Sequence, residues 1–442
     1  MAVLALEPAM PGSQQSRRGL RACLCLLLVV MISSSSLVAY RNLDTAIPLD
    51  AVTVAIGPGG ALVEVAGADA LVPGSRVLGG MPDSLELARE QAAWLAAGTV
   101  PQVSGLDSDM VATALLDLQV LSQPYGVPVA GWSSLWRYFW PRDAALVASA
   151  LARTGHTADA ERIVGFLQRV QPESGLFEAR YLPDGSGVPD GRGVELDGLG
   201  WALWATGQLA AELPKEDRTA LVQRYRRLLD QSTKAVLALI DNPSSLPPPS
   251  ADYWEVKETK LTLATAAVLC AGLETSAELY RILGDAQAAD DAAAGAHRLQ
   301  AAIKSTFGKN GYPRRVGGRA DSIDLGVDFL LPPLSSSVDR AVVHAWEQAP
   351  LVMSRPGGGL APGGSWRRDG VSWTNVTASR AMTAAFLGHR DEAVAWLRWL
   401  DKHRTAAGSL PEKVLPDGQP ASVSPLAWTA AAVVITASEL SS

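Results

Sequence analysis

Cysteine and histidine are scarce in this sequence, and their scarcity excludes two kinds of site. There are three cysteines in 442 residues, and two of them, Cys23 and Cys25, lie in an apolar stretch near the N-terminus. Cys270 alone cannot form a disulfide framework or a cysteine zinc site. The five histidines show no HxH or HxxxH spacing, so nothing indicates a metal-dependent hydrolase. We expect no metal and no cofactor.

An excess of basic residues is also absent. The formal net charge is −7 at pH 7, whereas a nucleic-acid-binding surface needs clustered lysine and arginine. Phenylalanine and tyrosine number 6 and 8 against 13 tryptophans. Tryptophan can fill a core, but such a surplus also suits a cleft that stacks flat ligand faces. Hydrophobic residues make up 48% of the chain, which is enough to bury a large core and argues against disorder.

The first 40 residues have the layout of an export segment. Arg17, Arg18 and Arg21 precede an apolar run at 22–32, and this order is typical of a signal peptide or signal anchor. With the following serines included, residues 22–40 are about long enough to span a bilayer. Cleavage and retention of the segment remain open alternatives. Either one predicts an extracytoplasmic protein that is membrane-anchored or secreted.

The remaining chain divides into a short β-like arm at 41–82 and a long helical region at 83–442. In the arm, short apolar stretches alternate with Gly-Pro turns, as in strands and hairpins. From residue 83 onward the apolar residues recur with a helical period. The sequence predicts helices over 83–97, 107–123, 142–154, 157–170, 197–212, 215–240, 255–272, 275–284, 286–306, 336–348, 374–388, 390–404 and 425–440.

Long and short connections alternate between these helices. The segment 144–151 is apolar on nearly all sides, whereas 390–404 is amphipathic, as expected of inner and outer helices respectively. This alternation predicts an all-α (α/α)6 toroid, or barrel, with the long loops on one rim. A helical solenoid would need a fixed repeat, and none recurs. The long Gly- and Pro-rich loops cover residues 171–195, 241–253, 308–333, 354–373 and 405–424.

Arg142 and Asp143 are candidate binding residues, because they follow Trp140 directly at a predicted helix start. An Asp there can simply interact with the helix dipole. An Arg-Asp pair beside a tryptophan can also grip sugar hydroxyls while the ring covers an apolar face. Asp197, in the motif ELDGLGW, can likewise be a helix N-cap or a binding group.

Two glutamates are the candidate catalytic residues. Glu255 ends the motif DYWE and is expected at a helix start, where it can merely favour the dipole. Trp254 before it would supply the apolar wall that raises the pKa of a general acid. Glu412 in GSLPEKV lies in an irregular loop, although Lys413 could pair with it at the surface. Trp373, in a loop that follows a Gly-rich run, offers a further aromatic platform.

Five motifs together resemble the glucoamylase family of glycoside hydrolases (family 15), in its prokaryotic branch. They occur in the family's order across about 300 residues. Prokaryotic relatives usually have a large β-sandwich before the barrel, where this chain has only the short arm. Relatives also often have PEQ where this loop has PEKV. The motifs are WPRDAA at 140–145, DG…ELDGLGW at 184–201, DYWE at 252–255, GSLPEKV at 408–414 and SPLAW at 424–428.

The resemblance implies an exo-acting, inverting enzyme that releases sugar from the non-reducing end of α-linked glucans or α-glucosides. Glu255 would be the general acid and Glu412 the general base. Two carboxyls with room for a water between them give inversion. The residues expected to bind the substrate are Arg142, Asp143, Trp140, Asp197, Trp254 and Trp373.

Other functions remain open. The chain could be a catalytically silent carbohydrate-binding protein of the cell envelope on the same toroid, or a glycosidase for another sugar such as trehalose. A binding protein has no need for carboxylates in both loops. A toroidal cyclase or transferase would need a Cys/His metal site or an acidic diphosphate-binding motif, and neither occurs. The expected partner is an oligo- or polysaccharide, with membrane contact only through the N-terminal segment.

Overall fold

The structure, a computed structural model, describes residues 51–441. The predicted export segment at 1–40 lies outside these residues. Within 51–441, no helix combines the length and the apolar character that crossing a membrane requires. The described residues all belong to one unit, Leu49–Ser442.

Most of the described chain is helical, with two small antiparallel sheets. The strands are β1 (Thr53–Ile56), β2 (Leu62–Val65), β3 (Ser372–Trp373), β4 (Lys413–Val414) and β5 (Pro420–Ala421). The 3-10 helices are η1 (Pro58–Gly60), η2 (Ala68–Ala70), η3 (Gly308–Asn310), η4 (Ala320–Ser322) and η5 (Leu325–Leu330). The α-helices are α2 (Ser84–Ala97), α3 (Met110–Ser122), α4 (Pro141–Arg153), α5 (Thr157–Val170), α6 (Asp197–Glu212), α7 (Lys215–Arg224), α8 (Arg226–Leu239), α9 (Leu263–Leu283), α10 (Ala286–Phe307), α11 (Arg340–Gln348), α12 (Pro350–Met353), α13 (Thr374–Phe386), α14 (Arg390–Lys402) and α15 (Ala427–Ser441).

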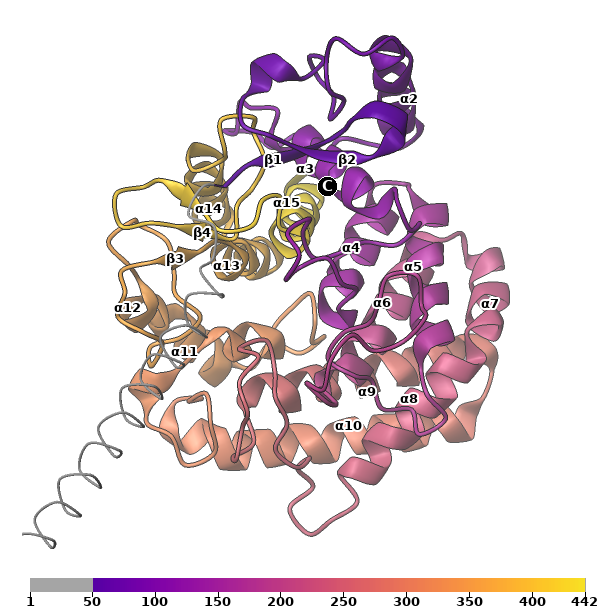
Figure 1. Cartoon of the computed structure of the whole chain (residues 1–442). Coiled ribbons are helices and arrows are strands. Elements are labelled where there is room, and N and C mark those ends of the chain that lie inside the picture. The colour runs from indigo at the N-terminus through magenta and orange to yellow at the C-terminus, as the bar shows by residue number, and fades with distance from the viewer. Residues whose placement is uncertain (1–50, 442) are drawn as a thin grey trace, which may run out of the picture. The chain divides into compact units, whose positions relative to one another are not determined.

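Six inner elements form a closed ring. α4 packs against α6, α6 against α9, α13 against α15, and α15 against α4. The 3-10 helix η5 completes the ring between α9 and α13. An outer layer covers this ring: α3 lies on α15, α5 on α4, α8 on α6, α10 on α9, α11 on η5 and α14 on α13 (Figure 1). The predicted (α/α)6 toroid is therefore confirmed.

Burial separates the inner helices from the outer ones. In α4 every residue except the last, Arg153, is buried. In α14 only Ala393, Val394, Leu397 and Leu400 are buried, which is the spacing of one helix face. The predicted inner position of 144–151 and outer position of 390–404 are thus correct.

Two glycines let the inner helices α6 and α9 approach closely. A Cβ added to Gly200 would lie 2.1 Å from the carbonyl oxygen of Val268, and one added to Gly272 would lie 2.7 Å from the Cα of Gly200. Any side chain at these positions would push the two helices apart. The close contact therefore depends on glycine.

The N-terminal arm is a β-hairpin. β1 pairs with β2 so that Thr53 faces Val65 and Ile56 faces Leu62. Its apolar residues pack against Val120 of α3. Farther along the arm, Arg76 forms a buried ion pair with Asp117 of α3 at 2.5 Å. These contacts attach the arm to the outer layer.

Two predicted helix boundaries were wrong. The predicted helix 215–240 is interrupted at Tyr225, which separates α7 from α8. The predicted helices 255–272 and 275–284 are the single helix α9, which begins only at Leu263. The side chain of Thr262 accepts a hydrogen bond from the backbone N–H of Thr265 and caps this helix start, as Thr commonly does.

The predicted loop at 308–333 contains an inner element of the ring, η5, which the sequence did not predict. Leu325, Val327 and Phe329 of η5 are buried, and the side chain of Asp324 caps its start. Six residues of 3-10 helix rise about 12 Å, against about 20 Å for a 13-residue α-helix. The inner wall is therefore short at this position, and α10 and α11 do not pack closely against each other beside it.

Candidate functional site

The predicted site residues lie at the amino-terminal ends of inner helices. Arg142 is in the first turn of α4, Asp197 is the first residue of α6, and Trp373 directly precedes α13. Glu255 and Glu412 lie in the loops before α9 and α15. Because inner and outer helices alternate along the chain, the inner helices run in the same direction. We call the end of the ring that holds their amino termini the mouth.

Arg142 is held by two buried acids. Its Nη1 donates to Glu195 Oε2 at 3.1 Å and to Asp197 Oδ2 at 3.0 Å. Asp197 also accepts from Trp201 Nε1 at 3.1 Å, while the N-cap of α6 is Leu196. The alternative of Asp197 as a helix N-cap is therefore wrong.

The charges of this cluster depend on one another. Burial by itself lowers the pKa of Arg142, but Asp197 and Glu195 outweigh it and the pKa is raised. Burial raises the pKa of both acids; the charge of Asp197 adds to the rise at Glu195, and the charge of Asp252 adds to the rise at Asp197. The guanidinium thus stays charged at the floor of the mouth.

Glu255 lies in an irregular loop and not at the predicted helix start. Its φ of 53° is in the left-handed region, where a non-glycine residue is uncommon. Its Oε2 contacts Arg192, and its Oε1 lies 3.8 Å from Arg142 Nη2. The neighbours of this carboxylate are therefore two guanidinium groups. The ring of Trp254, expected to give Glu255 an apolar wall, has the guanidinium of Arg314 over one face at 3.7 Å.

A buried ion network holds the loop that carries Glu255. Arg314, which is fully buried, donates to Asp252 Oδ1 at 2.7 Å and to Asp324 Oδ2 at 2.6 Å. Tyr253 donates to Asp324 Oδ2 at 2.8 Å. Breaking a buried pair by removing one partner is strongly destabilising. The network therefore ties the Glu255 loop to the start of η5.

Three donors converge on the buried carboxylate of Glu412. Trp136 Nε1 donates to Oε1 at 3.4 Å, Ser422 Oγ donates to Oε2 at 2.5 Å, and Lys413 Nζ lies 3.1 Å from Oε2. The Lys413 side chain is only 13% exposed and lies over the Trp373 ring at 4.4 Å. The predicted pairing of Lys413 with Glu412 is therefore present, but it is largely buried and not at the surface. Such donors interact best with an ionised carboxylate.

Asp143 connects the two glutamates. Burial raises the pKa of Asp143 to about 7; Arg142 opposes this shift, and the negative charges of Glu255 and Glu412 add to it. Charges shift a pKa only over short distances. Both glutamates, which lie far apart in the sequence, are therefore within electrostatic range of one buried carboxyl at the mouth.

Tryptophan rings surround these acids. Trp366 packs edge-on against Trp254 at 4.6 Å and against Trp373 at 5.4 Å between centroids. Trp140 lies 5.0 Å from the guanidinium of Arg180. Buried N–H groups are normally paired. Within residues 51–441, however, four indole N–H groups have no hydrogen-bond partner, those of Trp140, Trp254, Trp366 and Trp373.

All eight predicted site residues lie at or beside the mouth, but sequence reasoning missed several of their partners. Glu195 stands two residues before Asp197 in a motif already singled out, so its position was a usable signal. Arg192 lies in a loop far along the chain from Glu255, and nothing in the local sequence marked it. Ser422 lies ten residues after Glu412, in the same predicted loop 405–424, and Trp136 begins the aromatic stretch that leads to Trp140, so their positions were usable signals.

Glu255 and Glu412 line neither of the two cavities described next, and they are not part of a metal-binding cluster. A cavity of about 670 Å³ lies beside Trp366 and is also lined by Arg355 and Arg368. Another of about 460 Å³ lies between α9, α10 and α11 and holds none of the predicted residues. Across 51–441, no group of three or more His, Cys, Asp or Glu side chains is placed to hold a metal ion.

No protein-family model and no curated protein sequence matches the chain, but solved structures do. A bacterial glucoamylase complexed with acarbose matches with a TM-score of 0.65 and 19% identity, over 82% of this chain and 60% of that one. The fold is that of the glucoamylases. A glycosidase in complex with glucose matches with a TM-score of 0.65 and 21% identity, over 75% of this chain and 96% of that one. The glucoamylase from Saccharomycopsis fibuligera matches with a TM-score of 0.59 and 13% identity, over 79% and 95% of the two chains.

The TM-scores of these matches establish the glucoamylase fold that the motifs implied. The coverages show how much of each matched protein has a counterpart in this chain. The 96% coverage of the glycosidase chain means that the helical ring corresponds to nearly the whole of that protein. The 60% coverage of the bacterial glucoamylase means that about two fifths of that chain lie outside the match.

Proposed function

We propose that the protein is a glycoside hydrolase in which Glu255 is the general acid and Glu412 the general base. The observation that carries the proposal is that both glutamates lie at the mouth of a glucoamylase fold, with Glu255 3.8 Å from Arg142 and both within electrostatic range of Asp143. In this scheme Glu255 protonates the glycosidic oxygen and Glu412 activates a water molecule. The water attacks the anomeric carbon from the opposite face, so the product has the inverted configuration.

The surroundings of Glu412 suit a base. A base must be ionised before it accepts a proton, and Trp136, Ser422 and Lys413 all place donors on its oxygens. The carboxylate is also fixed in direction by these contacts, which holds the attacking water in one place. Glu255 is more open, with a side chain 33% exposed. This exposure suits a general acid, which must reach the leaving oxygen of a bound substrate.

Arg142 and Asp143 would grip the sugar beside the reacting bond. Arg142 Nε has no partner among residues 51–441 and can donate to a sugar hydroxyl. Asp143 has a pKa of about 7, so it can donate or accept near neutral pH. In this scheme Asp197 orients Arg142 and does not touch the sugar.

The tryptophans would complete the sugar site. Trp140, Trp254 and Trp373 each offer an unpaired indole N–H and an apolar ring face, the combination that sugar rings bind. The proposed substrates are α-linked glucans or α-glucosides, attacked from the non-reducing end. This choice is supported by neighbours that are glucoamylases, one complexed with acarbose, and by a glycosidase in complex with glucose. The basic and apolar N-terminal sequence supports action outside the cytoplasm.

The test is turnover by the full chain and its variants on maltose, isomaltose, trehalose, dextran and starch. Glu255→Gln and Glu412→Gln should each lose about 10²- to 10⁴-fold in kcat while the melting temperature stays near that of the parent. Glu173→Gln, at an exposed position, is the matched control. Full activity in either of the first two variants would overturn the assignment, and an NMR time course showing the retained anomer would exclude inversion.

A further inference from the structure

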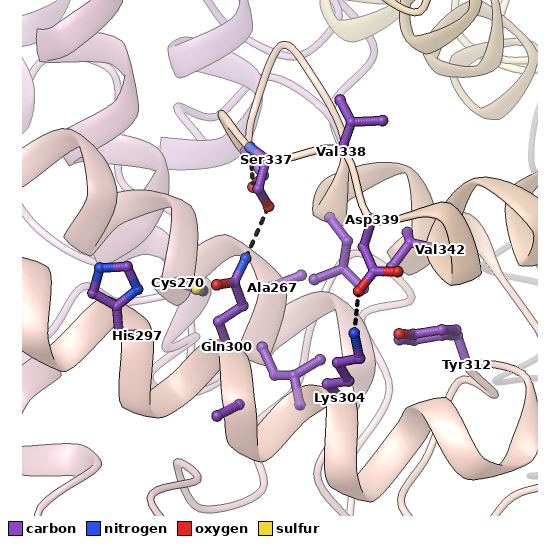
Figure 2. A pocket seen from close by; sticks show the side chains of 14 residues that line it. Ala267, Cys270, His297, Gln300, Lys304, Tyr312, Ser337, Val338, Asp339 and Val342 are labelled. Atoms are coloured by element: carbon purple, nitrogen blue, oxygen red, sulfur yellow. Dashed lines mark hydrogen bonds and ion pairs between the residues drawn. The ribbon is translucent and has the colours of Figure 1, made fainter.

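A second cavity lies in the outer wall of the ring, separate from the mouth. It has a volume of about 460 Å³ and is bounded by α9, α10, η5 and the start of α11 (Figure 2). It lies where the short inner element η5 leaves α10 and α11 apart. Its volume is within the range of about 300–1,000 Å³ that is typical of small-molecule sites.

The cavity has one apolar side and one polar side. Ala267, Ile303, Leu330 and Val342 supply the apolar side. On the polar side, two contacts cross from α10 to the segment 335–339 (Figure 2). They join Gln300 Nε2 to Ser337 Oγ at 2.8 Å, and Lys304 Nζ to Asp339 Oδ2 at 2.6 Å.

Tyr312 provides an unsatisfied hydroxyl in this cavity. Its side chain is almost fully buried, at 2% exposure, and its hydroxyl points toward the Lys304–Asp339 pair (Figure 2). This hydroxyl makes no hydrogen bond among residues 51–441, and its oxygen keeps some accessible surface, so it is free to meet a ligand in the cavity. Burial and the negative charge of Asp339 raise the pKa of Tyr312, so the hydroxyl keeps its proton as a donor.

The backbone of Tyr312 is also unusual. Its φ of 56° is in the left-handed region, which a bulky residue rarely adopts. Backbone strain of this kind concentrates at ligand and active sites. A tyrosine hydroxyl that lines a cavity and has no protein partner can also donate to or accept from a ligand, so the backbone and the side chain both mark this residue.

The charges of the cavity indicate the class of ligand. Lys304 and Asp339 carry opposite charges and are already paired, so a charged ligand would compete with this pair. A neutral ligand with several hydroxyls can accept from Lys304 and Tyr312 and donate to Asp339 without breaking it. The apolar side suits the C–H face of a sugar ring.

We propose that this cavity binds a neutral saccharide of one or two rings. Its occupancy does not depend on the proposed hydrolysis, because no residue of the mouth lines it. The two sites can therefore be tested separately.

The experiment uses the full chain carrying Glu412→Gln, so that no sugar is consumed. Hydrogen exchange read by mass spectrometry reports each segment separately, with D-glucose and maltose as probes. We expect at least about twofold slower exchange in 300–312 and 335–342, saturating with sugar concentration. Tyr312→Phe should weaken this binding about three- to tenfold. The hydroxyl of Tyr225 donates to Glu161 outside the cavity. Tyr225→Phe should therefore bind the sugars as tightly as the Glu412→Gln parent does.

Three results would each overturn the proposal. One is unchanged hydrogen exchange in 300–312 and 335–342 at about 100 mM sugar. This includes the case in which exchange slows only in segments of the mouth. Another is parent-like binding by Tyr312→Phe at an unchanged melting temperature. The third is tighter binding of glucose 6-phosphate than of glucose, which would indicate an anion site. If the protein proved not to hydrolyse glycosides, these exchange and binding measurements would keep the same meaning.

Discussion

The guanidinium of Arg192 contacts the carboxylate of Glu255, the proposed general acid. Arg192 also lies 3.4 Å from Asp190, which itself pairs with Arg180, so the loop carrying Arg192 is fastened next to this contact. The side chains of Arg192 and Glu255 are 35% and 33% exposed, and solvent weakens such pairs. A carboxyl engaged in this way must be released before it can protonate a leaving oxygen.

Replacing Arg192 by alanine should therefore increase activity modestly. An exposed ion pair contributes about 1 kcal/mol or less, so we expect kcat/KM of Arg192→Ala to rise by no more than about fivefold. Arg162→Ala removes another exposed ion pair, with Asp159, and should leave kcat/KM unchanged. A tenfold or greater loss in Arg192→Ala would show instead that this arginine holds the substrate.

Ser422 should matter through Glu412 alone. Its hydroxyl donates to Oε2 of Glu412 at 2.5 Å, so Ser422→Ala removes the shorter of the two contacts to this oxygen and leaves Lys413 at 3.1 Å. We expect kcat to fall about tenfold with KM nearly unchanged, because no sugar contact is lost. Steady-state kinetics measures this split.

Ser424 provides the matched control two residues away. Its hydroxyl is buried and has no partner within residues 51–441, so Ser424→Ala should leave both kcat and KM as in the parent. Equal losses of kcat in the two variants would mean that the loop as a whole, and not the Ser422 hydroxyl, supports Glu412.

Asp143 should make the protein less stable as the pH rises. Burial and the nearby glutamates raise the pKa of Asp143 from 3.8 to about 7, so between these values the folded state binds more protons than the unfolded state. Stability then falls with rising pH across this window. Relative to the parent, Asp143→Asn should gain stability, on the order of a few kcal/mol, between about pH 4 and pH 7. Chemical denaturation at several pH values measures the difference.

Asp184 offers a control of opposite sign. Hydrogen bonds from the backbone and side chain of Ser186 lower the pKa of Asp184, so the stability that this carboxylate contributes is lost as the pH falls. The difference in free energy of unfolding between Asp184→Asn and the parent should therefore shrink toward low pH. A flat difference for Asp143→Asn across the same window would contradict the burial of that carboxyl.

Gly200→Ala should destabilise the ring. The new methyl group would lie 2.1 Å from the backbone oxygen of Val268, which cannot yield without separating α6 from α9. We expect a loss of at least about 2 kcal/mol in the free energy of unfolding. In α5, Gly165→Ala places its methyl group at an ordinary 3.5 Å from Tyr225 and should instead gain up to about 1 kcal/mol. Similar effects of the two substitutions would argue against close packing of α6 on α9.

The sequence predicted those parts of the fold whose local pattern and tertiary environment agree. α4 and α14 have the all-round apolar and one-sided apolar patterns of their positions, so both were recognised. Residues 255–262 have a helical composition, yet they are a loop. Arg314, far along the chain, holds Asp252 in that loop, and no local pattern reveals such a contact. η5 was missed for a related reason, because six residues are too few for a periodicity.

The candidate site divides in the same way. Its motif residues could be found because they stand together in short phrases such as WPRD and DYWE. Arg192, which contacts Glu255, comes from a loop that the fold alone brings near, whereas Ser422 lies in the same loop as Glu412 but outside its motif. The arginine neighbours of Glu255 were not predicted for this reason, since Arg192 and Arg142 reach its carboxylate from distant parts of the chain.

The shared direction of the inner helices has an electrostatic consequence. Each helix carries a partial positive charge at its amino terminus, and these ends meet at the mouth. The five acids there offset that field, and in the proposed mechanism they would favour the positive charge of the transition state. Converting them together to amides would leave the helix termini and Arg142 unopposed. The same opening would then attract anions in place of neutral sugars. The acids are Asp143, Glu195, Asp197, Glu255 and Glu412.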